Sequence, residues 1–315
     1  MDADAKRLDD AARAGWLYYV VGNTQEEIAA KLGISRQSAQ RLVSLAMSEG
    51  LIRVRLEHPI AACLNLAREL KSAFNLELAE VVPTDPSSNS TTVGVAQAGA
   101  AEIERFLSRP EPSIMGIGTG RTLKAAIDQI KKMDASQHSV VSLTGNIGPD
   151  GSAAYYNVIY GMANFVNARL YAMPLPVIAS SAEERASLHQ LPLLKKTLAL
   201  AARAQCTFVG IGDMGEHAPL IVDGFIKAAD LKALQKAGAI GEICGWVYDA
   251  EGHIIDGLTN ARVASAPIPT RKSSLVVAIA KGPVKLPGIR AAIRHRLVNG
   301  LITDEQTASE MLRHL

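Results

Sequence analysis

The chain has 315 residues, of which 48% are hydrophobic and 20% are charged, and its formal net charge is only +2. This length and balance fit a folded protein with two domains of unequal size; they exclude a disordered tail, and the overall charge does not by itself indicate a nucleic-acid partner. The polar, acidic start is unlike a secretory signal, and no apolar run reaches about 18 residues, so we expect a cytoplasmic protein without a membrane segment. The three cysteines are far apart and lack metal-ligand spacing, which predicts reduced thiols, no metal and no cofactor.

The segment TQEEIAAKLGISRQSAQRL has the pattern of a helix-turn-helix. Thr24, followed three residues later by Glu27, predicts a capping box at the start of a helix. Gly33 predicts the end of that helix, and Ser35 is a typical cap for the next one. An amphipathic segment precedes this pair and carries four apolar residues on one face: Leu8, Ala12, Trp16 and Tyr19.

The second helix carries the side chains that we expect to contact DNA. Arginine can bind guanine through two hydrogen bonds, glutamine can do the same with adenine, and serine at a helix N-terminus suits a phosphate. The predicted contacts are Ser35, Arg36, Gln37, Gln40 and Arg41. The alternating LIRVRLE that follows predicts a small wing whose Arg53 and Arg55 point toward the DNA backbone. The alternative is a helical hairpin with solvated charges, but we favour a winged helix-turn-helix DNA-binding domain over residues 1–58.

Residues 59–315 have the pattern of a larger α/β domain that begins with a connector helix at about 60–75. Short apolar strands alternate with helices, which predicts a Rossmann-like, mostly parallel sheet covered on both faces. The predicted strands are 77–83, 113–118, 139–145, 168–174, 206–212 and 273–280.

Ligands of such sheets bind at the carboxyl ends of the strands, where this sequence places loops rich in glycine and polar residues. Glycines permit close approach of a ligand, and the polar side chains there can bind hydroxyls or an anion. The candidate effector-binding residues are Gly118, Thr119, Gly120, Arg121, Gly145, Asn146, Asp213, Glu242, Trp246 and Lys285. The alternatives are that the glycines only form tight turns, that Asp213 is a turn cap and that Glu242 and Lys285 are a surface pair. The histidines show no catalytic or metal-binding spacing, so we expect no catalytic residue.

The combination of motifs resembles the SorC family of bacterial sugar-sensing regulators over almost the whole chain. The motifs are TQEEIAAKLGISRQSAQRL, GIGTGRT, TGN, GEICGWVYDAEG and VAIAKGPVKLPGIRAAIRHRLVNGLITDEQTASEML. The helix-turn-helix alone is shared by many families, whereas its combination with the C-terminal motifs is specific. The start DDAARAGWLYYVVG further resembles regulators of erythritol-type polyol catabolism.

This resemblance implies a sugar-isomerase-like domain that binds a sugar, polyol or sugar phosphate without converting it. It also implies a homotetramer or homodimer that binds a double-stranded DNA operator of a catabolic operon. Family members often carry an arginine where this chain has Trp246, and the loss of that cation favours an unphosphorylated effector.

Two other functions are alternatives to a regulator. The C-terminal domain could be a phosphosugar isomerase or deaminase, with Glu242 or Asp213 as the base and Lys285 stabilising an enolate. A fused helix-turn-helix argues against this, because a metabolic enzyme does not need one. Alternatively, the α/β domain could serve only for oligomerisation, but its glycine-rich loops favour a sensing domain.

Overall fold

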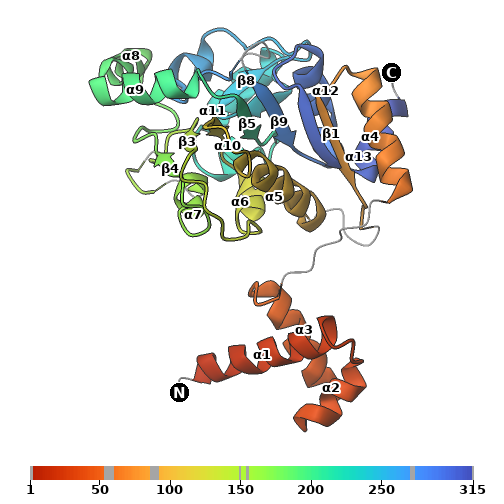
Figure 1. The fold of residues 1–315 in the computed structure, drawn as a ribbon. Helices are drawn as coiled ribbons and strands as arrows, with labels where there is room; N and C mark the ends of the chain where they lie inside the picture. The colour runs from red at the N-terminus through yellow and green to blue at the C-terminus, as the bar shows by residue number, and fades with distance from the viewer. Residues whose placement is uncertain are drawn as a thin grey trace. The chain divides into compact units, whose positions relative to one another are not determined.

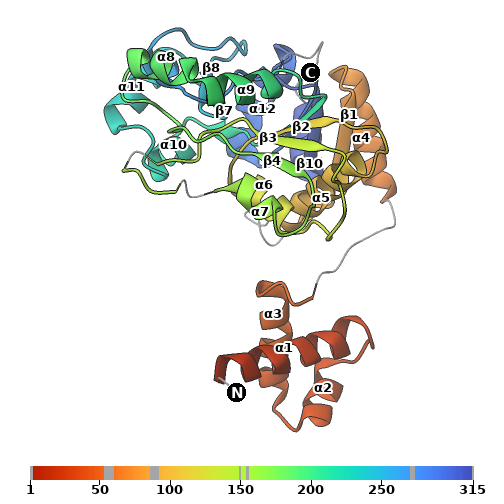
Figure 2. The ribbon, with the colours of Figure 1, turned by 60° about the vertical axis from the view of Figure 1, so that its left-hand side comes forward.

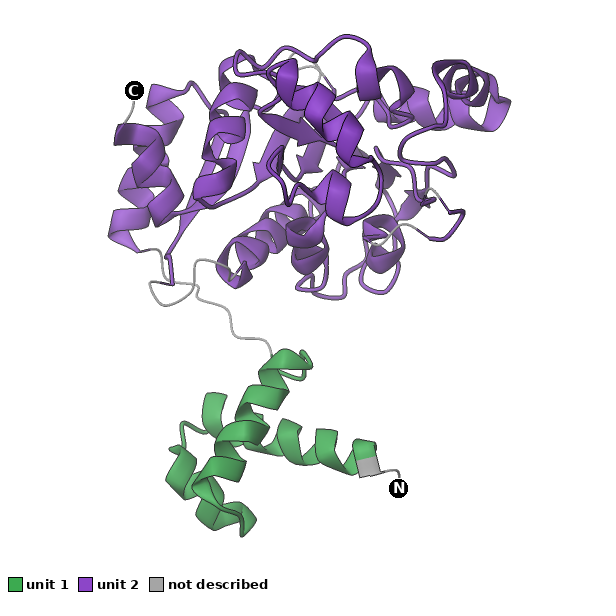
Figure 3. Cartoon of the chain, turned by 180° about the vertical axis from the view of Figure 1, so that it is seen from behind, with its two compact units in different colours: residues 1–58 green, residues 59–315 purple. Residues whose placement is uncertain are grey.

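The computed structural model describes residues 3–52, 60–85, 92–148, 150–153, 156–269 and 274–313. The chain separates into two compact units, Met1–His58 and Pro59–Leu315 (Figure 3). Each unit is described by itself.

The N-terminal unit contains three helices: α1 (Ala3–Tyr19), α2 (Gln25–Leu32) and α3 (Arg36–Ser48) (Figure 1). Their shared core is small and aliphatic, with Leu17 from α1, Ile28 from α2 and Val43 from α3 all buried. The predicted wing, with Arg53 and Arg55, lies outside the described residues.

Helix α1 does not pack through the apolar face that the sequence suggests. Trp16 is 52% exposed, whereas Ala11 and Ala14 are fully buried. A Cβ atom at Gly15 would lie 2.8 Å from the Cβ atom of Ala46 on α3, so α1 approaches α3 through its smallest residues. Close backbone approach, rather than the size of the apolar side chains, therefore determines which face of α1 is buried.

The C-terminal unit is built on a seven-stranded sheet in which the order is β1-β10-β9-β5-β2-β3-β4 and all neighbours run parallel. The strands are β1 (Leu78–Val82), β2 (Ile114–Ile117), β3 (Ser139–Ser142), β4 (Arg169–Tyr171), β5 (Cys206–Val209), β9 (Leu275–Ile279) and β10 (Gly300–Asp304). The predicted parallel α/β fold is confirmed, and six of these strands lie where the sequence predicts them. The seventh, β10, was not predicted.

Helices cover both faces of the sheet (Figure 2). The helices of this unit are α4 (Ala61–Ala73), α5 (Val93–Leu107), α6 (Arg121–Ile127), α7 (Val158–Met162), α8 (Ala182–Gln190), α9 (Pro192–Ala201), α10 (Pro219–Val222), α11 (Ala228–Lys236), α12 (Leu286–Arg294) and α13 (Glu305–Arg313). Alternate residues of one strand enter different cores, because successive side chains point to opposite faces. Val277 of β9 joins the core under α5, α6 and α7, and its neighbour Ala278 joins the core under α4, α9, α12 and α13. The continuous apolar strands thus reflect burial on both sides.

A small antiparallel sheet lies beside the main one and consists of β6 (Gly212–Asp213), β7 (Gly241–Ile243) and β8 (Trp246–Tyr248). Two 3-10 helices, Leu258–Arg262 and Pro283–Lys285, complete the unit. Strand β6 follows directly after β5. Because β7 and β8 pair next to β6, the short sheet brings their residues to the carboxyl end of the main sheet.

Asp304, at the end of β10, gives the C-terminal unit a testable pH dependence. It is buried, accepts a hydrogen bond from the Thr307 N–H at 3.0 Å and lies 3.1 Å from the Lys281 Nζ atom. Burial alone raises the pKa of this carboxyl, but the hydrogen bonds from Thr307 and the Lys281 charge together hold its pKa below the ordinary 3.8. The ionised carboxylate therefore stabilises the fold above pH 3.8, and this stabilisation is lost as the pH falls through the lowered pKa.

We expect the Asp304→Asn variant to be less stable than the wild-type chain at neutral pH. The difference in free energy of unfolding should shrink as the pH falls through the lowered pKa of Asp304, because the wild-type carboxylate then takes up a proton. Urea unfolding followed by circular dichroism at several pH values measures this difference. A difference that stays constant from neutral to acid pH would contradict the assigned role of the ion pair.

Candidate functional site

The helix-turn-helix of the N-terminal unit is held by the caps that the sequence predicts. The Thr24 hydroxyl accepts a hydrogen bond from the Glu27 N–H at 3.3 Å, and the Glu27 carboxylate accepts one from the Thr24 N–H at 2.7 Å. Gly33 has a φ of +67°, which ends α2 in a left-handed turn. The Ser35 hydroxyl then caps α3 by accepting a hydrogen bond from the Ser38 N–H at 3.1 Å. These caps fix where α3 begins, and hence which side chains its first turns present.

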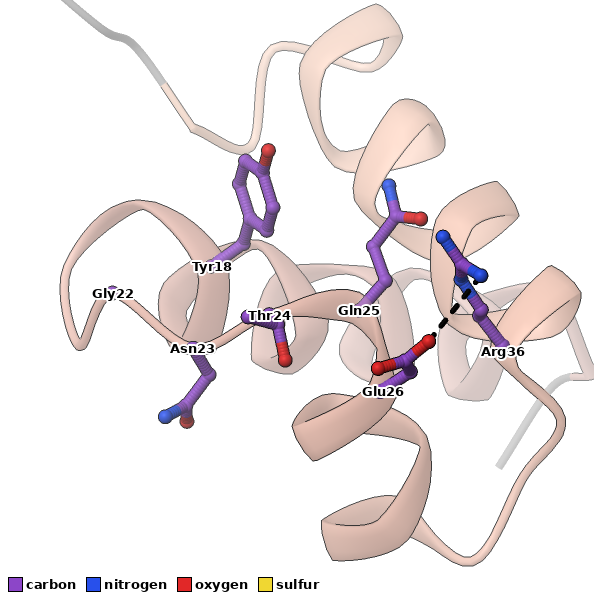
Figure 4. A pocket seen from close by; sticks show the side chains of 7 residues that line it. All are labelled: Tyr18, Gly22, Asn23, Thr24, Gln25, Glu26 and Arg36. Carbon is purple, nitrogen blue, oxygen red and sulfur yellow. Dashed lines mark ion pairs between the residues drawn. The ribbon is translucent and has the colours of Figure 1, made fainter.

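The predicted DNA-contacting side chains of α3 are exposed, while Ala39, Val43 and Ala46 on its other face are buried. The exposed residues are Ser35, Arg36, Gln37, Gln40 and Arg41. In Figure 4, Arg36 points toward Glu26 of α2, and an Arg36 Nη1 atom lies 3.3 Å from a Glu26 carboxylate oxygen. One continuous polar face is therefore available to a partner.

A second candidate site is a cavity of about 140 Å³ in the C-terminal unit, adjoined by a smaller cavity of about 60 Å³. Both are lined by the loops that follow β2 and β5, including Thr119, Gly120 and Gly210. The chain runs from β2 to β3 and β4 on one side and then returns to place β5 on the other side. The cavities thus lie at the point where the strand order reverses, which is the usual ligand site of an open parallel sheet.

The predicted polar groups of the larger cavity come from four separate segments of the chain. Thr119 and Arg121 follow β2, Asp213 lies on β6, Glu242 lies on β7 and Lys285 ends a 3-10 helix. Each was predicted as an effector contact from its place after a strand or in a glycine-rich loop. The fold brings them together around one cavity.

Glu242 is held against a glycine by the register of the small sheet. Gly212 pairs with Glu242, and a Cβ atom at Gly212 would lie only 2.2 Å from the Glu242 Oε1 atom. The other oxygen of Glu242 accepts a hydrogen bond from the Gly245 N–H at 2.8 Å. Only glycine therefore fits at position 212 while Glu242 keeps this position.

Glu242 and Lys285 influence each other's pKa in this cavity. Burial raises the pKa of Glu242, and the Gly245 hydrogen bond and Lys285 oppose that rise. Burial lowers the pKa of Lys285, and Glu242 and Asp213 oppose that fall. The sequence left open whether Glu242 and Lys285 form a surface pair; the structure instead places both at the cavity.

Arg121 is bonded to other residues that line the cavity. Its Nε atom donates a hydrogen bond to the Tyr156 hydroxyl at 2.7 Å, and its Nη2 atom lies 3.1 Å from the Asp223 carboxylate. The Thr119 hydroxyl also donates to the Tyr156 carbonyl at 2.7 Å. Arg121 is therefore already paired with Asp223, which lies 102 residues further along the chain.

The remaining predicted residues occupy different places. Gly145 lines the smaller cavity, where a Cβ atom would lie 2.5 Å from the carbonyl oxygens of Leu175 and Pro176. Three other candidates are not among the described residues that line either cavity: Gly118, Asn146 and Trp246. The Trp246 ring instead donates a hydrogen bond to the Ala266 carbonyl at 3.0 Å and is covered by Arg185.

Sequence reasoning missed Tyr156, His217 and Asp223, which also line the larger cavity. None follows a recognisable motif: Tyr156 lies just before α7, and His217 and Asp223 lie among the helices and turns between β5 and β7, where no regular spacing marks an inward side chain. Among the residues that the structure describes, no cluster of three or more histidine, cysteine or acidic side chains could hold a metal ion. No helix in the described part of the chain is both long and apolar enough to span a bilayer.

The chain is similar to known proteins in both sequence and fold. Residues 58–313 match the family model described as "Putative sugar-binding domain". The erythritol catabolism regulatory protein EryD of Brucella abortus is 30% identical over 302 residues, covering 96% of each chain. The chain belongs to the SorC family of sugar-binding transcriptional regulators.

Two further transcriptional regulators are similar to this chain along nearly their whole length. The transcriptional regulator LsrR of Enterobacter sp. is 29% identical over 317 residues, covering 96% of this chain and 92% of its own. The full-length sorbitol operon regulator SorC of Klebsiella pneumoniae has the same fold, with a TM-score of 0.72 over 98% of this chain and 99% of its own at 24% identity. Membership in this family makes the chain an effector-controlled transcriptional regulator and not an enzyme, so the isomerase or deaminase alternative is set aside.

Proposed function

We propose that α3 enters the major groove of a double-stranded operator. Its N-cap and first turn present Ser35, Arg36 and Gln37, and its second turn presents Gln40 and Arg41. The arginines and glutamines suit base edges, and Ser35 with the N-terminus of α3 suits a backbone phosphate. Arg53 and Arg55 stay proposed backbone contacts of a wing.

We further propose that the cavity of the C-terminal unit binds the effector, and that the effector is a neutral polyol or sugar. The observation that carries this is the charge of the lining: Asp213, Asp223 and Glu242 supply three carboxylates against Arg121 and Lys285. Arg121 is already paired with Asp223. An ionised carboxylate only accepts hydrogen bonds, so it suits ligand hydroxyls, and it repels a phosphate.

A thermal-shift screen of the full-length chain tests this proposal. The probes are erythritol, xylitol and sorbitol, with erythrose 4-phosphate, ribose 5-phosphate and inorganic phosphate beside them. A ligand that binds only the folded state raises the melting temperature through RT ln(1 + [L]/Kd). We expect a rise with at least one neutral polyol and none with inorganic phosphate; a rise confined to the phosphorylated compounds would contradict a neutral effector.

The regulator would act in the cytoplasm as a homodimer or homotetramer on two half-sites. Two copies of α3 can read half-sites that lie about one helical turn apart, or a multiple of that distance. The effector can change operator occupancy only by as much as its affinity differs between the DNA-competent and incompetent states. Light scattering of the purified chain measures the assembly, and a monomer at working concentration would contradict this part of the proposal.

A further inference from the structure

The N-termini of α2 and α3 share one open cavity in the N-terminal unit. Its volume is about 460 Å³, and its lining includes Tyr18 from α1, Gln25 and Glu26 from α2, and Arg36 from α3. Figure 4 shows Glu26 and Arg36 pointing toward each other across this cavity. Both side chains remain open to solvent, with exposed fractions of 72% and 69%.

The two acidic residues in the first turn of α2 have different roles. Glu27 forms the capping box with Thr24, so it is needed for α2 to begin where it does. Glu26 takes no part in that box, and its carboxylate lies 3.3 Å from the Arg36 guanidinium. The first turn of α3 has no acidic residue of its own. The negative charge next to Arg36 is thus supplied by α2.

We propose that Glu26 holds Arg36 in the free protein and thereby acts as a specificity-determining residue for DNA. A base that accepts two hydrogen bonds from the guanidinium draws Arg36 away from Glu26, and the ion pair is lost. A wrong sequence offers no such base, so Arg36 stays paired with Glu26 at no cost. Glu26 therefore weakens specific binding more than non-specific binding. This inference rests on the proposed entry of α3 into the groove.

The test compares two duplexes and five forms of the full-length chain, the wild type and four variants. One duplex, the selected duplex, is enriched by the wild-type protein from a random pool; the other, the shuffled duplex, has the same composition in a different order. The variants are Glu26→Gln, Glu49→Gln, and Glu26→Gln in an Arg36→Ala background with Arg36→Ala as its reference. Glu49, the exposed C-cap of α3, is the matched control because Glu49→Gln removes the same charge from the same unit.

We expect Glu26→Gln to tighten binding to the selected duplex more than to the shuffled duplex, so that the preference for the selected duplex rises about two- to fivefold, the range of one exposed charge contact. Glu49→Gln should leave the preference unchanged, and the effect of Glu26→Gln should largely vanish without Arg36. An unchanged or lower preference in Glu26→Gln, or an equal rise in the Arg36→Ala background, would overturn the inference alone. A wild-type chain that selects no sequence would overturn the proposed role of α3 as well, so the two failures are distinguishable.

Discussion

Replacement of Lys285 by methionine should strongly weaken effector binding while leaving DNA binding by the N-terminal unit intact. Methionine keeps most of the length of the side chain but removes the charge that offsets Glu242 and Asp213. Loss of a charged hydrogen-bond donor to the effector costs about 1.5–3 kcal/mol, which corresponds to a fall in affinity of roughly 10- to 150-fold. Titration calorimetry with the polyol that most stabilises the wild-type chain measures this fall.

The matched control for this variant is Lys232→Met, which removes an exposed lysine of α11. Lys232 is not among the described residues that line the cavities, so its loss should leave effector affinity unchanged. An effector affinity that survives in Lys285→Met, in a chain whose melting temperature is also unchanged, would show that the cavity is not the effector site.

Replacement of Arg36 by alanine should remove most of the sequence preference of DNA binding. A bidentate contact to one base contributes about 1–3 kcal/mol of discrimination, which corresponds to roughly five- to 150-fold in affinity. Binding to the shuffled duplex should change much less, because it depends on phosphate contacts that several residues share. Fluorescence anisotropy with both duplexes at several salt concentrations separates these effects.

Arg13→Ala, on the exposed side of α1, provides the same loss of charge away from α3. We expect it to weaken binding to both duplexes by the same small factor. If Arg36→Ala behaves like Arg13→Ala, Arg36 contacts only the backbone or nothing, and the reading of base edges by α3 is wrong.

The local signals in this sequence were strong where one residue type alone satisfies a backbone requirement. Thr24 with Glu27 predicted the start of α2, and Gly33 predicted its left-handed end, because few other residues can provide these hydrogen bonds and this conformation. The same reasoning located the loops after β2 and β5, where glycines permit a close approach to the cavity. It could not predict which of the neighbouring polar side chains turn inward.

Features that depend on distant contacts escaped prediction. Strand β10 was missed because its five residues begin with a glycine and end in polar Thr303 and Asp304, whose burial arises only when β1 and β9 pack on either side. Asp223 and Tyr156 were missed because their partner, Arg121, lies many residues away. Trp246 was placed in the site from its neighbours along the chain, whereas the structure binds its ring nitrogen to Ala266.

The direct test of the account is to titrate the full-length chain, bound to its selected duplex, with the neutral polyol that stabilises it. We predict that the polyol shifts operator affinity in the wild-type chain and, at the same concentration, has much less effect on the Lys285→Met variant, which should still bind the duplex. Operator binding that does not respond to polyols, or a response that persists undiminished without Lys285, would contradict the proposed link between the cavity and α3.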